Sequence, residues 1–391
     1  MQVLQKIWQY LCAHRIEVFL VLLAGAYFLF VYITDPNRPG LTNGGGWLSY
    51  FDQGAYLKQA IATAHGNLGS YYVYGPLYPL MAVPFIWLGF TGGGAFLPFN
   101  LAAFCFIVWA TYRFATALAN KRIGFVAALA LVFATPLITY MVIPWNSTVT
   151  IVSTGILLWA ASVSPKRFSN RTVLLLAVAV TLAFGSRYID ALWFFMLAAV
   201  LIYLRMGWHK IILLGSATFL LCIPIFWTHA AIFGSPLRTP YVLHTAMGGI
   251  GPTDQQLGAY DLRRVPNAAY GMFISPILAG VPDASRGFLV NGFWLLFAFV
   301  LLFNIRRLPK TQRLFVVALL AMVVIHALFY LSFRASGPGA LKFGTLHYFK
   351  TFWPVLTVCA TVSLSFIVES FIDTDRSNTP HKKMTRQKIS A

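Results

Sequence analysis

The chain has 391 residues, of which 59% are hydrophobic and only 10% are charged. Soluble domains contain roughly 25% charged residues, so this composition excludes a soluble globular enzyme, a disordered protein and a secreted disulfide scaffold. The 29 Lys and Arg against 10 Asp and Glu give a net charge of +19. The basic residues stand in short clusters between apolar runs, which is typical of cytoplasmic loops and not of a nucleic-acid groove. The sequence therefore predicts a polytopic membrane protein without a nucleic-acid partner.

Ten apolar segments are predicted to be transmembrane helices, each of which needs about 20 apolar residues. They lie at 16–33, 96–117, 123–140, 147–162, 171–186, 190–205, 210–229, 288–304, 313–333 and 349–370. The first segment ends at Thr34-Asp35-Pro36 without a small-residue cleavage pattern, so we do not expect a cleaved signal peptide. The predicted fold class is all-α, a transmembrane bundle of about ten spans with further helices on its outer face.

The distribution of basic residues predicts the orientation. If ten spans are counted, one set of loops and the C-terminal tail hold most of the Lys and Arg, so both termini are expected in the cytoplasm. The opposite, outer side is much less positive and carries six of the ten acids: Asp35, Asp52, Asp190, Asp254, Asp261 and Asp283.

Residues 76–90 complicate this count because they are apolar but short and contain three prolines, which remove helix donors. Counting them as a span would place Lys121 and Arg122 outside. We interpret 76–90 as an interfacial or re-entrant helix on the outer side, with a full span as the alternative.

The chain is predicted to form one transmembrane domain over 1–372, followed by a disordered basic cytoplasmic tail over 373–391. Two long outer segments, 34–95 and 230–287, interrupt the spans, and long connections of this kind are usually functional or disordered. The four cysteines lie far apart and form no CxxC motif, so neither a disulfide framework nor a zinc site is expected: Cys12, Cys105, Cys222 and Cys359.

Asp52 is the strongest candidate for a catalytic residue. It lies just beyond the first span, in a stretch from Leu48 to Ala64 whose pattern predicts a short amphipathic helix on the membrane surface. Partial burial among Tyr50, Phe51 and Tyr56 would make its carboxylate a useful base. The alternatives are a solvated loop acid or a helix N-cap.

Aromatic residues follow on the same side, in Tyr71-Tyr-Val-Tyr-Gly-Pro-Leu-Tyr-Pro79. This stretch fits either an aromatic belt at the bilayer interface or the lining of a sugar or headgroup site. Tyr74 and Tyr78, with Tyr56, are therefore candidate substrate-lining residues.

Cations are predicted at three outer positions, where a guanidinium or ammonium suits phosphate. Arg187 stands in Gly185-Ser-Arg-Tyr-Ile-Asp190, where an Arg187–Asp190 pair that tethers the hairpin is the alternative. The second outer segment offers Tyr241 and His244 as lining residues. Arg334, His347 and Lys350 lie around the start of the last span and fit either phosphate binding or headgroup anchoring.

This set of an acid, several cations and many aromatics suits a reaction between a lipid-borne phosphate and an acceptor hydroxyl. Motifs for zinc proteases, serine hydrolases and nucleotide binding are absent from the sequence, as is a close Cys/His cluster. We therefore expect no metal site and no cofactor, and the sequence gives a divalent metal no support.

The order of these motifs resembles the GT-C superfamily of integral membrane glycosyltransferases. It is most similar to the protein-mannosyltransferase and aminoarabinose-transferase-like group, which includes RgtA/B/C/D-like domains. The resemblance covers most of 16–370. Its motifs are Phe51-Asp-Gln-Gly-Ala-Tyr56, Tyr74-Gly-Pro-Leu-Tyr-Pro79, Gly185-Ser-Arg-Tyr188, Phe233-Gly-Ser-Pro-Leu237 with Tyr241, and His347-Tyr-Phe-Lys-Thr-Phe-Trp-Pro354.

The resemblance implies a polyprenyl-phosphate sugar donor, a lipid-linked glycan or other acceptor, and contact with membrane lipids. It implies Asp52 as the base and an active site on the periplasmic or other extracytoplasmic face, and we expect a bacterial inner membrane location. Transfer by a single displacement would invert the anomeric centre, with Arg187 and either Arg334 or Lys350 stabilising the leaving phosphate. The chain departs from the family at Gln53 and at Pro144-Trp-Asn146, where the family often has acids.

Two other functional classes are compatible with the sequence. The first is a transporter or flippase for a lipid-linked or amphipathic solute, although no internal repeat is apparent. The second is a membrane protein without catalysis. An enzyme is expected to gather Asp52, Arg187 and Lys350 in one outer cavity, whereas a transporter is expected to have a path that continues toward the cytoplasm.

Overall fold

The computed structural model describes Gln5 and residues 12–35, 51–67, 75–237, 261–270, 292–332 and 349–378. Every secondary-structure element in these ranges is a helix. The first half comprises α2 (Arg15–Thr34), α3 (Phe51–Ala64), α4 (Leu77–Trp87), η2 (Gly92–Phe96), α5 (Leu97–Leu118), α6 (Lys121–Val132), α7 (Thr135–Val142), α8 (Ser147–Ser162), η3 (Pro165–Arg167) and α9 (Asn170–Ser186). The second half comprises α10 (Tyr188–Met206), α11 (His209–Phe233), η4 (Leu262–Arg264), α14 (Val265–Ala269), η7 (Phe293–Leu296), α16 (Phe297–Val300), η8 (Leu301–Arg307), α17 (Lys310–Leu331), η11 (Lys350–Phe352) and α19 (Trp353–Asn378).

Six helices in the described ranges are long and apolar enough to cross a membrane, and a bent pair of helices raises this to seven. The six are Arg15–Thr34, Gly92–Leu118, Tyr188–Met206, His209–Ile232, Lys310–Leu331 and Lys350–Ile372. The bent pair is α6 with α7, whose axes differ by 58°. The all-helical class and multi-span character predicted from the sequence are therefore confirmed.

The predicted number of ten spans is not confirmed. Helices α8 and α9 coincide with predicted spans but contain only 16 and 17 residues, below the roughly 20 residues that a straight crossing needs. The segment predicted at 288–304 contains short 3-10 and α-helical turns from Phe293 onward. Apolar composition alone therefore overestimated how many segments form long, regular helices.

Helix α5 lies in the interior of the bundle and packs against α2, α6 and α8. Two glycines allow the close approaches. A Cβ added at Gly124 of α6 would lie 2.8 Å from the Tyr112 carbonyl oxygen, and one at Gly155 of α8 would meet the Phe106 ring. Small residues at helix crossings let backbones pack closely, as is common inside membranes.

A polar contact fixes α2 against α5 within the apolar bundle. The Trp109 indole N–H donates to Glu17 Oε2 at 2.6 Å, and Arg113 Nη1 lies 3.3 Å from Glu17 Oε1. Since an unpaired carboxylate is costly in an apolar setting, these two partners specify how α2 is rotated about its axis.

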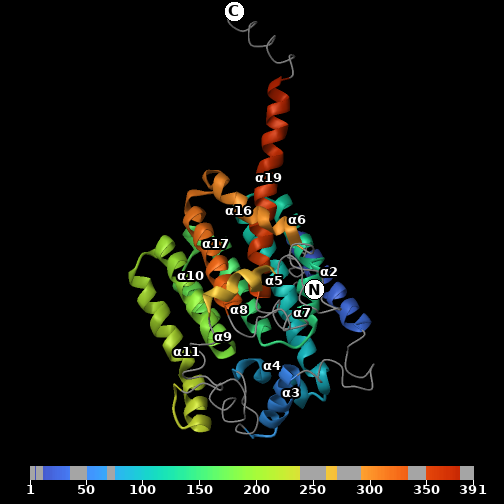
Figure 1. The fold of residues 1–391 in the computed structure, drawn as a ribbon, viewed down its shortest axis with the longest axis vertical. Coiled ribbons are helices and arrows are strands. Elements are labelled where there is room, and N and C mark those ends of the chain that lie inside the picture. The colour runs from blue at the N-terminus through green and yellow to red at the C-terminus, as the bar shows by residue number, and fades with distance from the viewer. Residues whose placement is uncertain are drawn as a thin grey trace, which may run out of the picture.

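Helices α3 and α4 pack together at the end of the bundle opposite the C-terminal end of α19 (Figure 1). Helix α3, Phe51–Ala64, corresponds to the surface helix predicted from Leu48 to Ala64. Helix α4 contains 11 residues, so it rises about 16 Å and cannot cross a hydrocarbon core of about 30 Å. This length favours the interpretation of 76–90 as an interfacial or re-entrant segment.

The last helix is longer than predicted. Helix α19 continues to Asn378, beyond the boundary at 372 where a disordered tail was expected, and residues 379–391 lie outside the described ranges. Arg307 from η8 donates to the Phe366 carbonyl at 2.8 Å and to Ser370 Oγ at 2.7 Å. These bonds anchor the helix where its apolar sequence gives way to charged residues.

The packing at Gly124 is testable by comparison with Gly215 of α11, around which a Cβ would meet nothing within 4 Å. Gly215→Ala should stabilise the protein by about 0.5–1 kcal/mol because alanine restricts the unfolded chain. Gly124→Ala should instead destabilise it by about 1–3 kcal/mol because the methyl group must displace backbone atoms. Thermal unfolding in detergent measures both changes, and equal shifts would contradict the close crossing.

Candidate functional site

Asp52 lies in the first turn of α3, so it is not the N-cap that the sequence allowed as an alternative. It is partly exposed, while Tyr56 one turn later is 1% exposed. Residues four apart share a helix face, so Asp52 stands on the face of α3 that Tyr56 buries. A carboxylate in the first turn also gains from the helix dipole.

Tyr56 and Tyr78 link α3 to the rest of the bundle. Their rings meet edge to face with centroids 5.3 Å apart, and Tyr78 stacks on Phe96 at 4.9 Å. The buried Tyr78 hydroxyl donates to Asn100 Oδ1 at 3.1 Å and is hydrogen bonded to the backbone of Trp145. The structure thus brings together two of the predicted substrate-lining residues, as tightly packed aromatics.

The connection between α7 and α8 joins the break between α9 and α10. Ser186 Oγ donates to the Asn146 carbonyl at 2.7 Å, and Asn146 Nδ2 donates to the Ser186 carbonyl at 3.4 Å. Gly75, at the start of α4, packs on the same break, because a Cβ there would lie 2.7 Å from the Ser186 carbonyl oxygen. Three helix ends therefore meet beside Arg187.

Arg187 is buried in the break itself, with an extended backbone (φ −147°, ψ 104°) that separates α9 from α10. Its Nη1 lies 4.0 Å from Asp190 Oδ2, and its guanidinium lies 5.3 Å from the centre of the Tyr330 ring. The Arg187–Asp190 pair that the sequence allowed as an alternative is therefore present, but its geometry is loose and leaves the guanidinium facing an aromatic ring.

Asp190 is 1% exposed and ties α10 to α17. Its Oδ1 accepts a hydrogen bond from Tyr330 at 3.0 Å and lies 4.0 Å from His326 Nδ1. His326 and Tyr330 are one turn apart on α17 and their rings are in contact at 4.5 Å. The carboxylate thus holds Arg187 and α17 in one cluster.

Lys350 opens the last long helix and is 1% exposed. Its ammonium donates to the Tyr140 carbonyl at 2.9 Å and to Thr148 Oγ1 at 3.0 Å. The next residue continues this polar contact with α8: Thr351 Oγ1 lies 3.0 Å from Thr150 Oγ1, and the Thr351 carbonyl accepts from Thr154 at 3.1 Å. The start of the helix is therefore surrounded by polar groups, namely the Lys350 ammonium and threonine hydroxyls.

The cluster is rich in positive charge. Among the described residues, Arg187 and Lys350 are the buried Arg and Lys side chains and Asp190 is the buried acid. The Lys350 ammonium donates to Thr148, two residues after Asn146, and Asn146 bonds with Ser186 next to Arg187, so one chain of contacts joins the two cations. Both hydrogen-bond partners of the Lys350 ammonium are neutral oxygens. A buried cation held only by neutral groups is costly, and an anion would offset that cost.

The remaining predicted site residues lie outside the described ranges, so their positions relative to this cluster stay predictions: Arg334, His347, Tyr74, Tyr241 and His244.

Several residues in the cluster were not predicted from the sequence. His326 carried a usable signal, since an ionisable side chain inside an apolar span is a functional candidate. Gln53 and Ser147 are fully buried with side-chain polar atoms that have no hydrogen-bond partner. Buried polar groups without partners are rare, which marks both as candidates for contact with a ligand.

Within the described ranges, no group of three His, Cys, Asp or Glu side chains is arranged to hold a metal ion. Asp261, in the short helical segment that packs on α17, accepts a hydrogen bond from Arg263 at 3.0 Å. That bond lowers the pKa of the Asp261 carboxyl from its ordinary value. Asp261 thus differs from Asp190, which is buried in the cluster.

No protein-family model matches the chain, and no curated protein matches it. The function is therefore inferred from the arrangement of the helices and side chains.

The Asp190–Tyr330 hydrogen bond is testable with Tyr330→Phe, which keeps the ring under Arg187 but removes the donor. A buried carboxylate that loses a hydrogen bond costs about 1–3 kcal/mol. Tyr203→Phe is the control because Tyr203, on α10, is exposed, so the loss of its hydroxyl removes no buried contact. Chemical or thermal unfolding should show a loss for Tyr330→Phe alone, and equal stability of the two variants would contradict the contact.

Proposed function

We propose that the protein is a membrane glycosyltransferase that moves a sugar from a polyprenyl-phosphate donor to a hydroxyl of a lipid-linked glycan or another acceptor. The observation that carries the proposal is the buried ammonium of Lys350, which has only neutral hydrogen-bond partners. Through Thr148, Asn146 and Ser186 it belongs to the same network of contacts as Arg187. Two cations at a set of helix ends form a binding site for a phosphate.

The leaving group of this reaction is a phosphate, which gains negative charge as the bond to the sugar breaks. Fixed donors in a water-poor site stabilise such charge more strongly than they would in water. Lys350 is held by two hydrogen bonds, and Arg187 is buried between Asp190 and the Tyr330 ring with room to turn toward a phosphate. We assign them to the phosphate, with Arg334 and His347 as further donor-binding residues.

Asp52 is assigned as the general base. Its helix is joined to the two cations by continuous contacts: Tyr56 packs on Tyr78, and Tyr78 bonds to the α7–α8 connection. From there, Asn146 reaches Ser186 beside Arg187, and Thr148 reaches Lys350. The base and the cations are thereby tied to one rigid frame, which suits a reaction that requires their relative placement.

The proposed step is a single displacement at the anomeric carbon. The acceptor oxygen forms a bond to that carbon as the carbon–oxygen bond to the phosphate breaks. The acceptor proton passes to the Asp52 carboxylate, and the electron pair of the broken bond leaves with the phosphate. The configuration at the anomeric carbon is inverted. Tyr56, Tyr74, Tyr78, Tyr241 and His244 are assigned to the lining of the substrate site.

The finer topology belongs to the same proposal. We assign ten membrane crossings of unequal length, both termini to the cytoplasm and the α3–α4 end to the periplasmic or other extracytoplasmic face of a bacterial inner membrane. This GT-C-like arrangement is supported by helical structure in each of the ten predicted segments and by the positive-inside distribution of Lys and Arg in the sequence.

The role of Asp52 is tested with the purified protein in nanodiscs, a panel of radiolabelled polyprenyl-phosphate sugars and a membrane lipid extract. Asp52→Asn removes the base while preserving size, so turnover should fall about 10²–10⁴-fold. Asp261→Asn is the matched control, because Asp261 pairs with Arg263 at an exposed position, and it should keep full activity. Transfer that survives Asp52→Asn would remove Asp52 from the mechanism.

The phosphate assignment is tested separately with Lys350→Met in the same assay. An apolar side chain of similar length avoids an unpaired buried charge, so the variant should fold but turn over about 10²–10³-fold more slowly. Lys350→Arg should retain more activity than Lys350→Met because it keeps the charge. Lys166→Met, at an exposed lysine, controls for loss of positive charge in general. Equal turnover in Lys350→Met and Lys166→Met would refute the assignment.

A transporter or flippase for a lipid-linked or amphipathic solute is the second candidate. One observation favours it: α6 and α7 form a broken helix with a 58° bend, and broken helices beside buried charges are common at transporter binding sites. The two functions separate in proteoliposomes. A transporter moves labelled solute across the bilayer without forming a product. The proposed enzyme instead forms the glycosylated acceptor and releases polyprenyl phosphate.

A further inference from the structure

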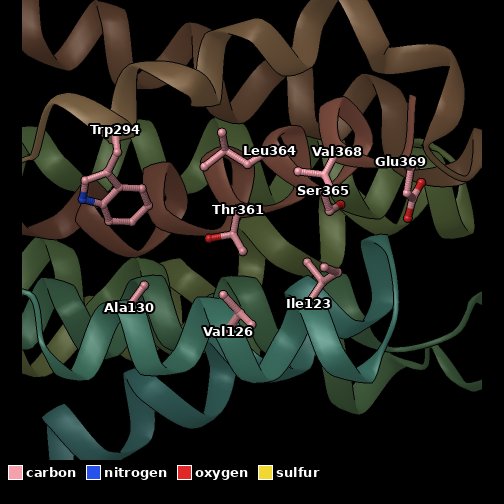
Figure 2. A pocket seen from close by; sticks show the side chains of 9 residues that line it. All are labelled: Ile123, Val126, Ala130, Trp294, Thr361, Leu364, Ser365, Val368 and Glu369. Carbon is pink, nitrogen blue, oxygen red and sulfur yellow. The ribbon is translucent and has the colours of Figure 1, made fainter. Parts of the chain in front are cut away.

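An apolar groove runs between α6 and α19, away from the cluster around Lys350 (Figure 2). Its volume is about 460 Å³. Ile123, Val126 and Ala130 form one wall and recur on one face of α6, while the other wall comes from α19 and Trp294 closes one end. The α19 wall consists of Thr361, Leu364, Ser365, Val368 and Glu369.

The groove is open along its length, toward the surroundings of the bundle. Val126 is 51% exposed and Val368 is 54% exposed, whereas Ala127, Ala128 and Leu131 on the other face of α6 are fully buried. Both walls belong to helices that are apolar and long enough to cross a membrane, α6 as part of the bent pair. The medium that meets the open side is therefore hydrocarbon.

The two hydroxyls in the wall are already satisfied. Thr361 Oγ1 donates to the Thr357 carbonyl and Ser365 Oγ donates to the Val362 carbonyl, each at 2.8 Å and within α19. Neither donor is available to a polar ligand, and a water in the groove would lack the partners that hold buried waters. A hydrocarbon chain, in contrast, covers these walls without breaking a hydrogen bond.

One end of the groove is charged. Figure 2 places Ile123 and Glu369 together at the end opposite Trp294 and Ala130. Ile123 directly follows Lys121 and Arg122, which are exposed in the first turn of α6 after its Asn120 cap. Cations at this position attract a phosphate at the bilayer surface. From this end, the groove therefore begins at charged residues, continues between apolar walls and is closed by the Trp294 ring.

We propose that this groove is a binding site for a membrane phospholipid. One acyl chain lies between α6 and α19 and ends against Trp294, and the headgroup phosphate binds Lys121 and Arg122. The assignment does not depend on glycosyl transfer, so it holds or fails separately from the proposed function.

The test uses the full chain in nanodiscs of phosphatidylethanolamine and phosphatidylglycerol that contain a phosphatidylethanolamine with a diazirine midway along one acyl chain. After illumination, mass spectrometry of peptides should find lipid adducts concentrated on the groove walls, above the density on the lipid-facing surface of α11 around Phe219, which is 63% exposed. Equal adduct density on the two surfaces would overturn the proposal.

Substitution separates a site from general lipid contact. Val126→Trp fills the channel, so adducts on Leu364 and Val368 should fall to the level seen on α11. Phe219→Trp is the control and should leave them unchanged. If Val126→Trp does not give a monodisperse protein, Val368→Trp makes the same test from the opposite wall. Adducts that persist in the filled variant would contradict the site, as would crosslinks from the groove to a second copy of the chain in place of lipid.

The headgroup contact is tested by detergent delipidation followed by native mass spectrometry. The double variant Lys121→Gln, Arg122→Gln should retain less phospholipid than the wild type. Lys166→Gln, Arg167→Gln removes two cations from another exposed pair and should retain as much as the wild type. Equal retention by the two double variants would remove Lys121 and Arg122 from the site.

Discussion

The hydrogen bonds of the Lys350 ammonium are the contact on which the arrangement of the other helices depends. One bond reaches a carbonyl of α7 and the other a hydroxyl of α8, so a single charge fixes the start of α19 against two segments about 200 positions earlier in the sequence. A buried ammonium needs such partners because an unsatisfied charge is expensive in an apolar medium. The position of α19 is thus specified by polar chemistry as well as by apolar packing.

This requirement explains why helix ends gather at one place. Inside a membrane, backbone groups left unpaired at a helix end must find partners within the protein. Helix α7 ends before Asn146, α9 ends at Ser186 and α19 begins beside Lys350, and each end supplies carbonyls or hydroxyls to another. The polar backbone and side-chain groups at these helix ends therefore form hydrogen bonds with one another. Together they make a polar, cationic cluster where the helices meet.

Hydropathy predicted the helical class and the positions of the long helices, because a bilayer-spanning helix must be apolar over most of its length. It did not predict that α8 and α9 would be shorter than the other apolar helices. Among the residues proposed for the site, Asp52, Arg187 and Lys350 were identifiable because charged residues are rare in such a chain. Thr148, Ser186 and Tyr330 were not, since threonine, serine and tyrosine are ordinary residues in apolar helices and only the fold shows which of them meet a charge. The burial of Gln53 could not be predicted either, because it depends on how α3 packs against α4.

The last helix also relates the two sites to each other. Lys350 lies at its start and Glu369 near its other end, and the intervening residues rise about 30 Å, which is close to the thickness of the hydrocarbon core. The cationic cluster and the charged mouth of the α6–α19 groove therefore lie near opposite surfaces of the same bilayer. In the proposed topology the donor is attached to a lipid in the outer leaflet, so the groove mouth would face the inner leaflet and a different population of lipids. The lipid proposed to bind there contacts α19, which directly follows η11 and Lys350. The two proposed sites therefore lie along one continuous helical segment and do not compete for the same lipid.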